Sequence, residues 1–176
     1  ETCPHYFSLT EKACEGFNTN AKMNPPLRTE EDVLAIKEAL RDGTIDCIVT
    51  DHAPHHPDEK ECEFGCAKNG IVGLETSLGL GIKNLVNEGY LTLGGLLEKM
   101  ALNPARLLNI AKGTLCDGAI ADVIIFDPEK KWTVDISKLH SKSKNSPFDG
   151  FELFGKPQYV IKSGKIIIEK GELLCR

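Results

Sequence analysis

The spacing of apolar residues predicts a helix followed by a buried strand in the first third of the chain. Residues 30–42 have one apolar face at helical spacing, with Thr29 as an N-terminal cap and Gly43 as a stop. Residues 45–50 are mostly apolar and β-branched, which is typical of a strand buried on both faces. The segment before Tyr6 is expected to be the end of another strand. Such alternation of strand and helix favours a parallel α/β fold.

Around and beyond these two elements, the sequence predicts a short strand, a long loop and further helices. Residues 17–21 are predicted to form a short strand, and residues 57–69 a long polar loop of a kind that is often functional. Residues 75–87 are expected to be helical, Thr92 to cap a second helix, and Asn103 to begin a shorter one.

In the last third of the chain the pattern changes from helices to short strands. Strands are expected at residues 122–127, 132–134, 159–162 and 165–168. Ser163 and Gly164 join the last two and are typical of a hairpin turn. We therefore expect residues 1–112 to form one unit and residues 113–176 a smaller, β-rich unit.

Composition and charge narrow the classes of protein. The chain has 176 residues, of which 41% are hydrophobic and 27% charged, enough apolar material for a folded core. A net charge of -5 without a basic stripe argues against nucleic acid as a partner. The sequence has no apolar run of about 18 residues, as a membrane span needs, and no signal-peptide pattern. Seven cysteines without a framework spacing predict reduced thiols in a cytoplasmic protein.

The strongest candidate for chemistry is the segment from Asp51 to His55, which directly follows the strand expected at residues 45–50. Barrels of the α/β class build active sites at the C-terminal ends of their strands. Asp51 could ligate a divalent metal and accept a proton from a metal-bound water, whose pKa is lowered. The alternative interpretation is an aspartate that caps a turn, beside histidines on a solvated loop.

Two further segments carry signals that are weak when taken alone. His5 lies at an expected strand end, where neutral imidazole is a common metal ligand, although a lone histidine is more often structural. Pro25 and Pro26 would hold Asn24 on an extended backbone, where its amide could both donate to and accept from a substrate imide. The alternative for Asn24 is a stiff connection to the next helix.

Two other patterns leave metal and phosphate binding open. Cys62 and Cys66 have a spacing within the range of zinc pairs, but no second pair follows, which favours reduced thiols. Gly70 and Gly73 could approach a phosphate or another ligand, but the remainder of a P-loop pattern is absent and a plain turn is the alternative.

Taken together, these segments resemble the bacterial-type dihydroorotases of the amidohydrolase superfamily over almost the whole chain. Several independent motifs in the same order make the resemblance more specific than any one of them. The matching segments are residues 1–7, 18–28, 46–55, 73–76, 103–105 and 143–148.

The resemblance implies an α/β fold, a metal-dependent (β/α)8 TIM barrel flanked by a small β-sandwich. Residues 1–112 would supply about strands six to eight with their helices, and residues 113–176 part of the sandwich. An intact barrel takes roughly 250 residues, more than this chain has, and the first residue is Glu1 rather than Met. We therefore expect a C-terminal fragment.

The resemblance also implies a role for each candidate residue. His5 would ligate one metal, and Asp51 would ligate the other and serve as general base and acid. Asn24 would contact the pyrimidine ring, His55 would bind the substrate carboxylate, and residues 70–73 would offer backbone contacts to the ring. The cofactor would be Zn2+, two ions per complete site.

The implied reaction is the reversible cyclisation of N-carbamoyl-L-aspartate to L-dihydroorotate in de novo pyrimidine (UMP) biosynthesis. In ring opening, metal-activated hydroxide would attack the ring carbonyl, and Asp51 would carry the proton to the leaving nitrogen. The family also needs upstream metal and substrate ligands, among them a His-x-His pair and a carboxylated lysine. This chain does not contain them, so we expect it to be inactive alone.

Two other functions stay open. An allantoinase or hydantoinase shares the motif around His5 but usually lacks the combination of Asn24 with Asp51 and His55. A non-catalytic homologue would instead assemble with aspartate carbamoyltransferase. The expected partners are a small-molecule substrate, the missing N-terminal half of the barrel, and further copies in a homo-oligomer. An unpaired parallel edge should make the fragment marginal alone or self-associating.

Overall fold

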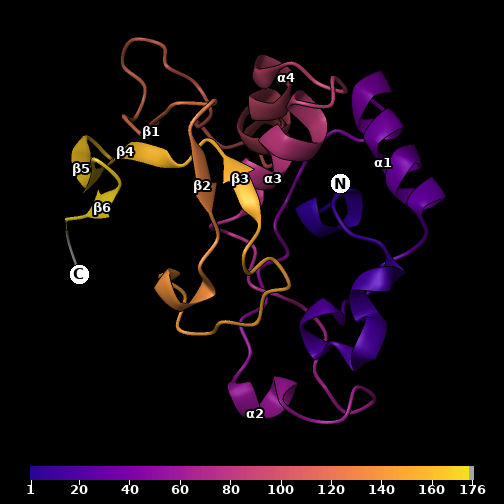
Figure 1. Cartoon of the computed structure of the whole chain (residues 1–176). Helices are drawn as coiled ribbons and strands as arrows, with labels where there is room; N and C mark the ends of the chain where they lie inside the picture. The colour runs from indigo at the N-terminus through magenta and orange to yellow at the C-terminus, as the bar shows by residue number, and fades with distance from the viewer. Residues whose placement is uncertain (175–176) are drawn as a thin grey trace.

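The structure, a computed structural model, describes residues 1–174 and joins a helical part to an antiparallel β-rich part (Figure 1). The α-helices are α1 (Glu30–Asp42), α2 (Pro57–Lys60), α3 (Ser77–Gly81), α4 (Leu93–Leu97) and α5 (Asn103–Leu107). Two π-helical turns continue α3 and join α4 to α5, namely η4 (Ile82–Val86) and η5 (Glu98–Leu102). Four 3-10 helices complete the set: η1 (Pro4–Phe7), η2 (Glu11–Phe17), η3 (Thr19–Ala21) and η6 (Ile136–Lys138). No helix within residues 1–174 combines the length and the apolar character needed to cross a bilayer.

The strands form two small antiparallel sheets on the side of the molecule opposite α1 (Figure 1). They are β1 (Val123–Phe126), β2 (Lys131–Thr133), β3 (Glu152–Phe154), β4 (Pro157–Lys162), β5 (Lys165–Glu169) and β6 (Glu172–Leu173). The larger sheet has the order β1-β4-β5-β6, and β2 pairs with β3. The hairpin predicted around Ser163 and Gly164 is confirmed, and both residues have positive φ angles, 49° and 79°.

Helix α1 has the boundaries that its sequence predicts. The Thr29 side chain accepts a hydrogen bond from the Asp32 amide, and the Asp32 carboxylate accepts one from the Thr29 amide, so that two free amides at the helix start are satisfied. Gly43 ends the helix with a φ of 87°. The predicted cap at Thr92 is confirmed as well, because its hydroxyl accepts from the Gly95 amide.

Several of the predicted elements differ in the structure, among them the loop predicted at residues 57–69, which begins with helix α2. The strand predicted at residues 17–21 is wrong: the segment is 3-10 helical, because Gly16 turns the chain at a φ of 71° and the Asn18 side chain accepts from the Asn20 amide. The strand predicted at 45–50 is reduced to a single parallel bridge at Ile48. The helix predicted from residue 75 begins at Ser77 and includes a π-helical turn.

A single buried cluster runs through both parts of the chain. Leu80 and Leu85 from the helical part belong to it together with Phe148 and Leu153 from the last third. Gly79 makes this contact close, since a Cβ atom there would lie 2.9 Å from the Cβ of Leu153. Strand β3 is thereby packed directly on α3, which fixes residues 134–154 against the helical part.

Candidate active site

Two parallel backbone pairings gather the candidate residues at one place. The Thr2 amide donates to the Cys47 carbonyl at 3.1 Å, and the Val49 amide donates to the Thr2 carbonyl at 2.9 Å. His5 and Asp51 each follow the paired residues Thr2 and Ile48 by three positions. Two parallel segments end at the same edge, and both side chains therefore emerge there.

The second pairing brings the glycine segment to the same edge. His52 forms a parallel bridge with Ile71, in which the Ala53 amide donates to the Ile71 carbonyl at 2.8 Å. The Gly73 amide donates to Nδ1 of His52 at 3.1 Å. The segment around Asp51 therefore lies between the N-terminal segment and residues 70–73.

His5 is a buried imidazole with an unsatisfied nitrogen. Its residue is 3% exposed, and Nε2 has no hydrogen-bond partner among the described residues. Burial lowers the pKa of His5 to about 4, and the nearby charge of Asp51 only partly opposes this shift. His5 is thus a neutral base at neutral pH with a free lone pair, which is the form that ligates a divalent metal.

Asp51 is exposed and stands in the left-handed backbone region, with a φ of 45°. This conformation is uncommon for residues other than glycine, and aspartate is among those that tolerate it. Burial raises the pKa of Cys3 to about 12, with the charge of Asp51 adding to it. The same charge acts on His5, so the carboxylate lies close to the residues that follow Thr2.

Asn24 lies on an exposed segment that is held at both sides. The Tyr6 hydroxyl donates to the Pro25 carbonyl at 2.7 Å. On the other side, the Gly70 amide donates to the Lys22 carbonyl at 2.9 Å. The segment of Asn24 is therefore tied both to the residue after His5 and to the glycine segment.

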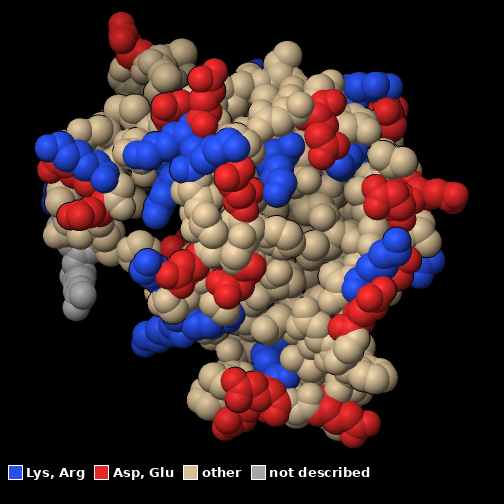
Figure 2. Space-filling view, viewed as in Figure 1, with Lys and Arg blue, Asp and Glu red and all other residues tan. Residues whose placement is uncertain are grey.

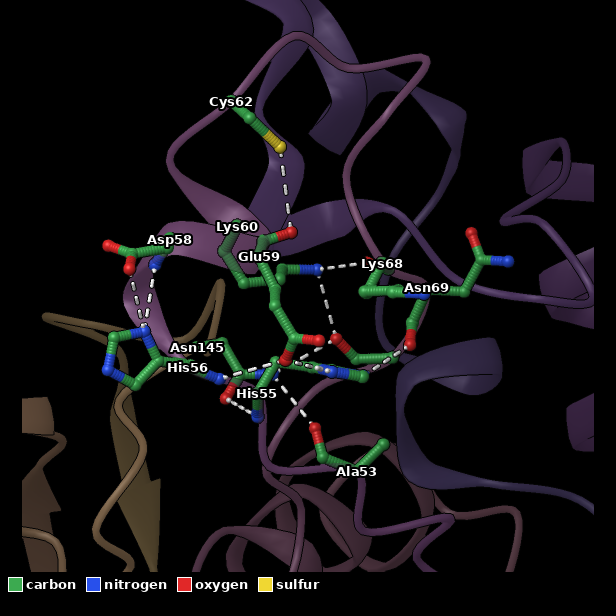
Figure 3. Close-up of polar contacts among 11 residues, drawn as sticks. Ala53, His55, His56, Asp58, Glu59, Lys60, Cys62, Lys68, Asn69 and Asn145 are labelled. Carbon is green, nitrogen blue, oxygen red and sulfur yellow. Dashed lines mark hydrogen bonds and ion pairs between the residues drawn. The ribbon is translucent and has the colours of Figure 1, made fainter.

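The ring of His55 makes two contacts within the chain (Figure 3). Nε2 lies 2.8 Å from the Asn69 carbonyl, and Nδ1 lies 3.3 Å from Oε2 of Glu59. Both partners are acceptors, so a ring nitrogen that carries a proton can donate to the partner beside it. No sequence pattern indicates that both nitrogens have partners within the chain, and a substrate carboxylate would have to replace one of these partners.

The two candidate glycines are required by close packing. A Cβ on Gly70 would lie 2.5 Å from the Cβ of Ala53, and one on Gly73 would lie 2.8 Å from the Thr50 carbonyl. Gly70 also has a φ of 109°. The amides of both glycines already donate within the chain, to Lys22 and His52, so they are not free for a ligand in this arrangement.

The residues present fit part of a metal centre. His5 offers a buried free nitrogen and Asp51 an exposed carboxylate at the same edge, but within residues 1–174 no three His, Cys, Asp or Glu side chains converge. Catalytic zinc sites usually have three protein ligands. The zinc pair at Cys62 and Cys66 gains no support, since both thiols are free and exposed. Of the seven cysteines, the six described are free thiols, and Cys175 lies outside the described residues.

Sequence reasoning missed the buried polar residues that hold this edge together, Lys60 and Asn145. Each is at most 5% exposed and donates to the Gly70 carbonyl at 3.1 Å. Asn145 lies in a motif shared with the resembling family, but nothing in the local pattern indicated a contact with residues 75 positions away.

A separate cavity of about 1080 Å3 lies between the helices and the β-rich part. Its lining is mainly apolar and includes Leu74, Leu97, Ile124 and Trp132. None of the candidate site residues lines it. The sequence did not indicate this cavity, since its walls come from segments far apart along the chain.

Comparison with known proteins finds a matching family, similar sequences and similar structures. The sequence pattern of the Amidohydrolase family matches residues 12–167. The dihydroorotase of Geobacter metallireducens is 61% identical over 170 residues, which are 97% of this chain and 40% of that protein. The dihydroorotase of Ruminiclostridium cellulolyticum is 56% identical over 174 residues, 99% of this chain and 41% of that protein. The chain thus spans about 40% of the length of the curated relatives it matches.

The chain also superposes on solved structures of hydantoinases. The L-hydantoinase (dihydropyrimidinase) from Arthrobacter aurescens superposes with a TM-score of 0.92 at 38% identity, over 98% of this chain and 40% of the other. The D-hydantoinase from a Thermus species gives 0.90 at 27% identity, over 99% of this chain and 40% of the other.

Proposed function

The chain belongs to the amidohydrolase family, a family of metal-dependent hydrolases with a TIM-barrel fold, and on this premise we propose that it forms part of a dihydroorotase. The complete protein would interconvert N-carbamoyl-L-aspartate and L-dihydroorotate in pyrimidine biosynthesis. One observation carries the proposal: the pairing of Thr2 with Ile48 brings a buried, unpartnered His5 to the same edge as the Asp51 carboxylate. The dihydroorotase relatives, at 56–61% identity, favour this substrate over hydantoins.

We propose that Asp51 moves the proton. It would accept a proton from the attacking water and return it to the ring nitrogen as the C–N bond of the cyclic amide breaks. His5 and Asp51 would hold divalent metal, proposed to be Zn2+, and the metal would lower the pKa of water bound to it. The further ligands would come from the part of the relatives that this chain does not span.

The remaining candidate residues would bind the substrate. The amide of Asn24 would donate to and accept from the ring, and His55, whose ring lies between Glu59 and the Asn69 carbonyl, would bind the substrate carboxylate. The backbone at Gly70 and Gly73 would form one wall of the ring pocket.

We also propose which parts of the family fold this chain supplies. Residues 1–112 would correspond to about strands six to eight of the barrel, and residues 113–176 to part of a small β-sandwich. The change from helices to antiparallel strands after Gly113 supports this division. The homo-oligomer and the cytoplasmic location expected from the sequence stay proposals.

The experiment is a ring-opening assay on the complete gene product, with dihydroorotate, hydantoin and allantoin compared and metal content measured. Turnover of dihydroorotate with bound zinc is expected. Asp51→Asn should lower kcat by on the order of 10²–10⁴-fold, while Asp58→Asn, at an exposed aspartate nearby, should leave it within about twofold.

Other outcomes would overturn the proposal. Preference for hydantoin or allantoin would assign the protein to the neighbouring cyclic amidohydrolases. Absence of turnover, together with co-purification of aspartate carbamoyltransferase, would assign it to the non-catalytic homologues.

A further inference from the structure

Both polar atoms of the Asn145 side chain form hydrogen bonds, and these bonds link two segments of the proposed substrate site, residues 53–55 and Gly70 (Figure 3). Oδ1 accepts from the His55 amide at 3.2 Å, and Nδ2 donates to the carbonyls of Ala53 at 2.9 Å and Gly70 at 3.1 Å. Its backbone carbonyl accepts from the Val72 amide at 3.0 Å. A buried residue of the β-rich part is therefore bonded to both walls of the site.

The Gly70 carbonyl has a second buried donor, Lys60. Nζ of Lys60 lies 3.1 Å from the Gly70 carbonyl and 2.8 Å from that of Lys68, and the residue is 3% exposed. A side chain on Gly70 would not fit beside Ala53, since a Cβ there would lie 2.5 Å from the Cβ of Ala53. The position of this peptide group is thus set by two buried donors, Lys60 and Asn145, that share its carbonyl.

We propose that Asn145 is a positioning residue, which holds the His55 backbone and the Gly70 peptide at the spacing that the substrate ring requires. The proposal rests on the proposed function, because that function makes these two segments substrate contacts. The positioning role would also explain the motif at residues 143–148, because the proposed reaction gives no role to any residue of that motif.

The chemistry of the site explains why a carboxamide is needed. The His55 amide requires an acceptor, while the carbonyls of Ala53 and Gly70 require donors. Asparagine supplies both from one short side chain. Aspartate at position 145 would keep the acceptor but turn a carboxylate oxygen towards two carbonyl oxygens, and alanine would remove every side-chain bond.

The test uses the complete gene product with Asn145→Asp and Asn145→Ala. Asn87→Asp, at an exposed asparagine, is the matched control for the amide-to-acid change. Thermal melting, kcat and KM for dihydroorotate, and hydrogen exchange at the His55 and Val72 amides are measured for each.

In both variants at position 145 we expect KM to rise about tenfold or more, from the loss of buried hydrogen bonds, with kcat changed by less than about threefold. The His55 amide should exchange about tenfold faster in Asn145→Ala and stay protected in Asn145→Asp.

The outcomes separate the two proposals. If the wild-type protein does not turn over dihydroorotate, the proposed function fails, and the exchange at His55 alone decides whether Asn145 holds the segments. Asn145→Asp with KM within about twofold of wild type, or Asn145→Ala with exchange at the His55 amide within about twofold of wild type, would overturn the positioning role. Failure of both variants to fold, or faster exchange spread over the whole core, would also overturn it, because Asn145 would then be a general structural residue.

Discussion

At the scale of single residues, the site combines one buried and one exposed ionisable group. His5 is enclosed and uncharged, whereas Asp51 is exposed on a strained turn. His55 differs from both, because a carbonyl and a carboxylate flank its ring. For His5, burial decides that the ring is offered to a metal in its neutral form.

Burial of His5 should make the stability of the metal-free protein depend on pH. Its pKa falls from 6.5 to about 4 on folding, so between these values the unfolded chain binds a proton that the folded chain does not. The free energy of unfolding should therefore decrease as the pH falls from 6.5 to 4, by about 3 kcal/mol for this residue. Denaturant unfolding of His5→Gln should show a flatter pH dependence than that of the wild type. Identical slopes in wild type and His5→Gln would contradict the prediction.

Gly70 should tolerate no side chain. Gly70→Ala adds a Cβ 2.5 Å from that of Ala53 at a backbone φ of 109°, and should destabilise the protein by on the order of 3 kcal/mol. Gly65→Ala is the control, since a Cβ there meets nothing within 4 Å. Removing the clash with Ala53→Gly should recover part of the loss in the double variant. Equal melting temperatures for Gly70→Ala and Gly65→Ala would show that the segment has room to move.

At the scale of elements, local chemistry fixes the helix ends, and packing fixes where the helices lie. Helix α1 shows the first effect at Thr29 and Gly43. Its buried Lys37 shows the second, because Nζ reaches Glu88 at 2.7 Å, from a segment that follows η4. A buried lysine of this kind needs such a partner.

The cap of α1 should contribute measurably to stability. Thr29→Ala removes the acceptor of the Asp32 amide and should cost about 1 kcal/mol in the free energy of unfolding. Thr10→Ala is the matched control, because Thr10 precedes η2 but its side chain makes no cap hydrogen bond. Chemical denaturation of the two variants provides the comparison, and equal losses would argue that the cap is not what stabilises α1.

At the scale of the whole molecule, several large hydrophobic side chains are exposed, among them Leu107, Leu115 and Ile124. Figure 2 shows a broad uncharged area across the middle of one face, with charged side chains around its rim. The cavity between the helices and the β-rich part is also lined by exposed apolar side chains, among them Ile124, which is 56% exposed, and Leu74, which is 60% exposed. The parallel pairings at Thr2 and His52 are single bridges with no further strand beside them among the described residues.

This surface should cause residues 1–176 to self-associate when produced alone. Sedimentation velocity should show a sedimentation coefficient that rises with concentration, because apolar area is removed from water on contact. Ile124→Lys should shift the distribution towards monomer, and Thr44→Lys, which adds the same charge at an exposed site after α1, should not. A monomer with a sharp melt that does not depend on concentration would contradict the prediction.

The sequence alone determined what depends on neighbours along the chain. The cap at Thr29, the stop at Gly43 and the hairpin at Ser163 and Gly164 follow from local hydrogen bonds and φ preferences, and all are confirmed. The family also followed from the motifs of the sequence, because their order along the chain survives without any coordinates. The prediction of a strand at residues 17–21 failed, because turn chemistry at Gly16 and Asn18 made this segment 3-10 helical.

Only the tertiary structure decided what depends on contacts between distant segments. It pairs Thr2 with Ile48, leaves Nε2 of His5 without a partner among residues 1–174, and places Asn145 between Ala53 and Gly70. The residues next to a side chain in the sequence do not predict whether it is buried, and they do not predict a hydrogen bond to a residue 75 positions away. Burial and such a hydrogen bond arise when packing removes water from that side chain and brings a donor or acceptor from elsewhere in the chain.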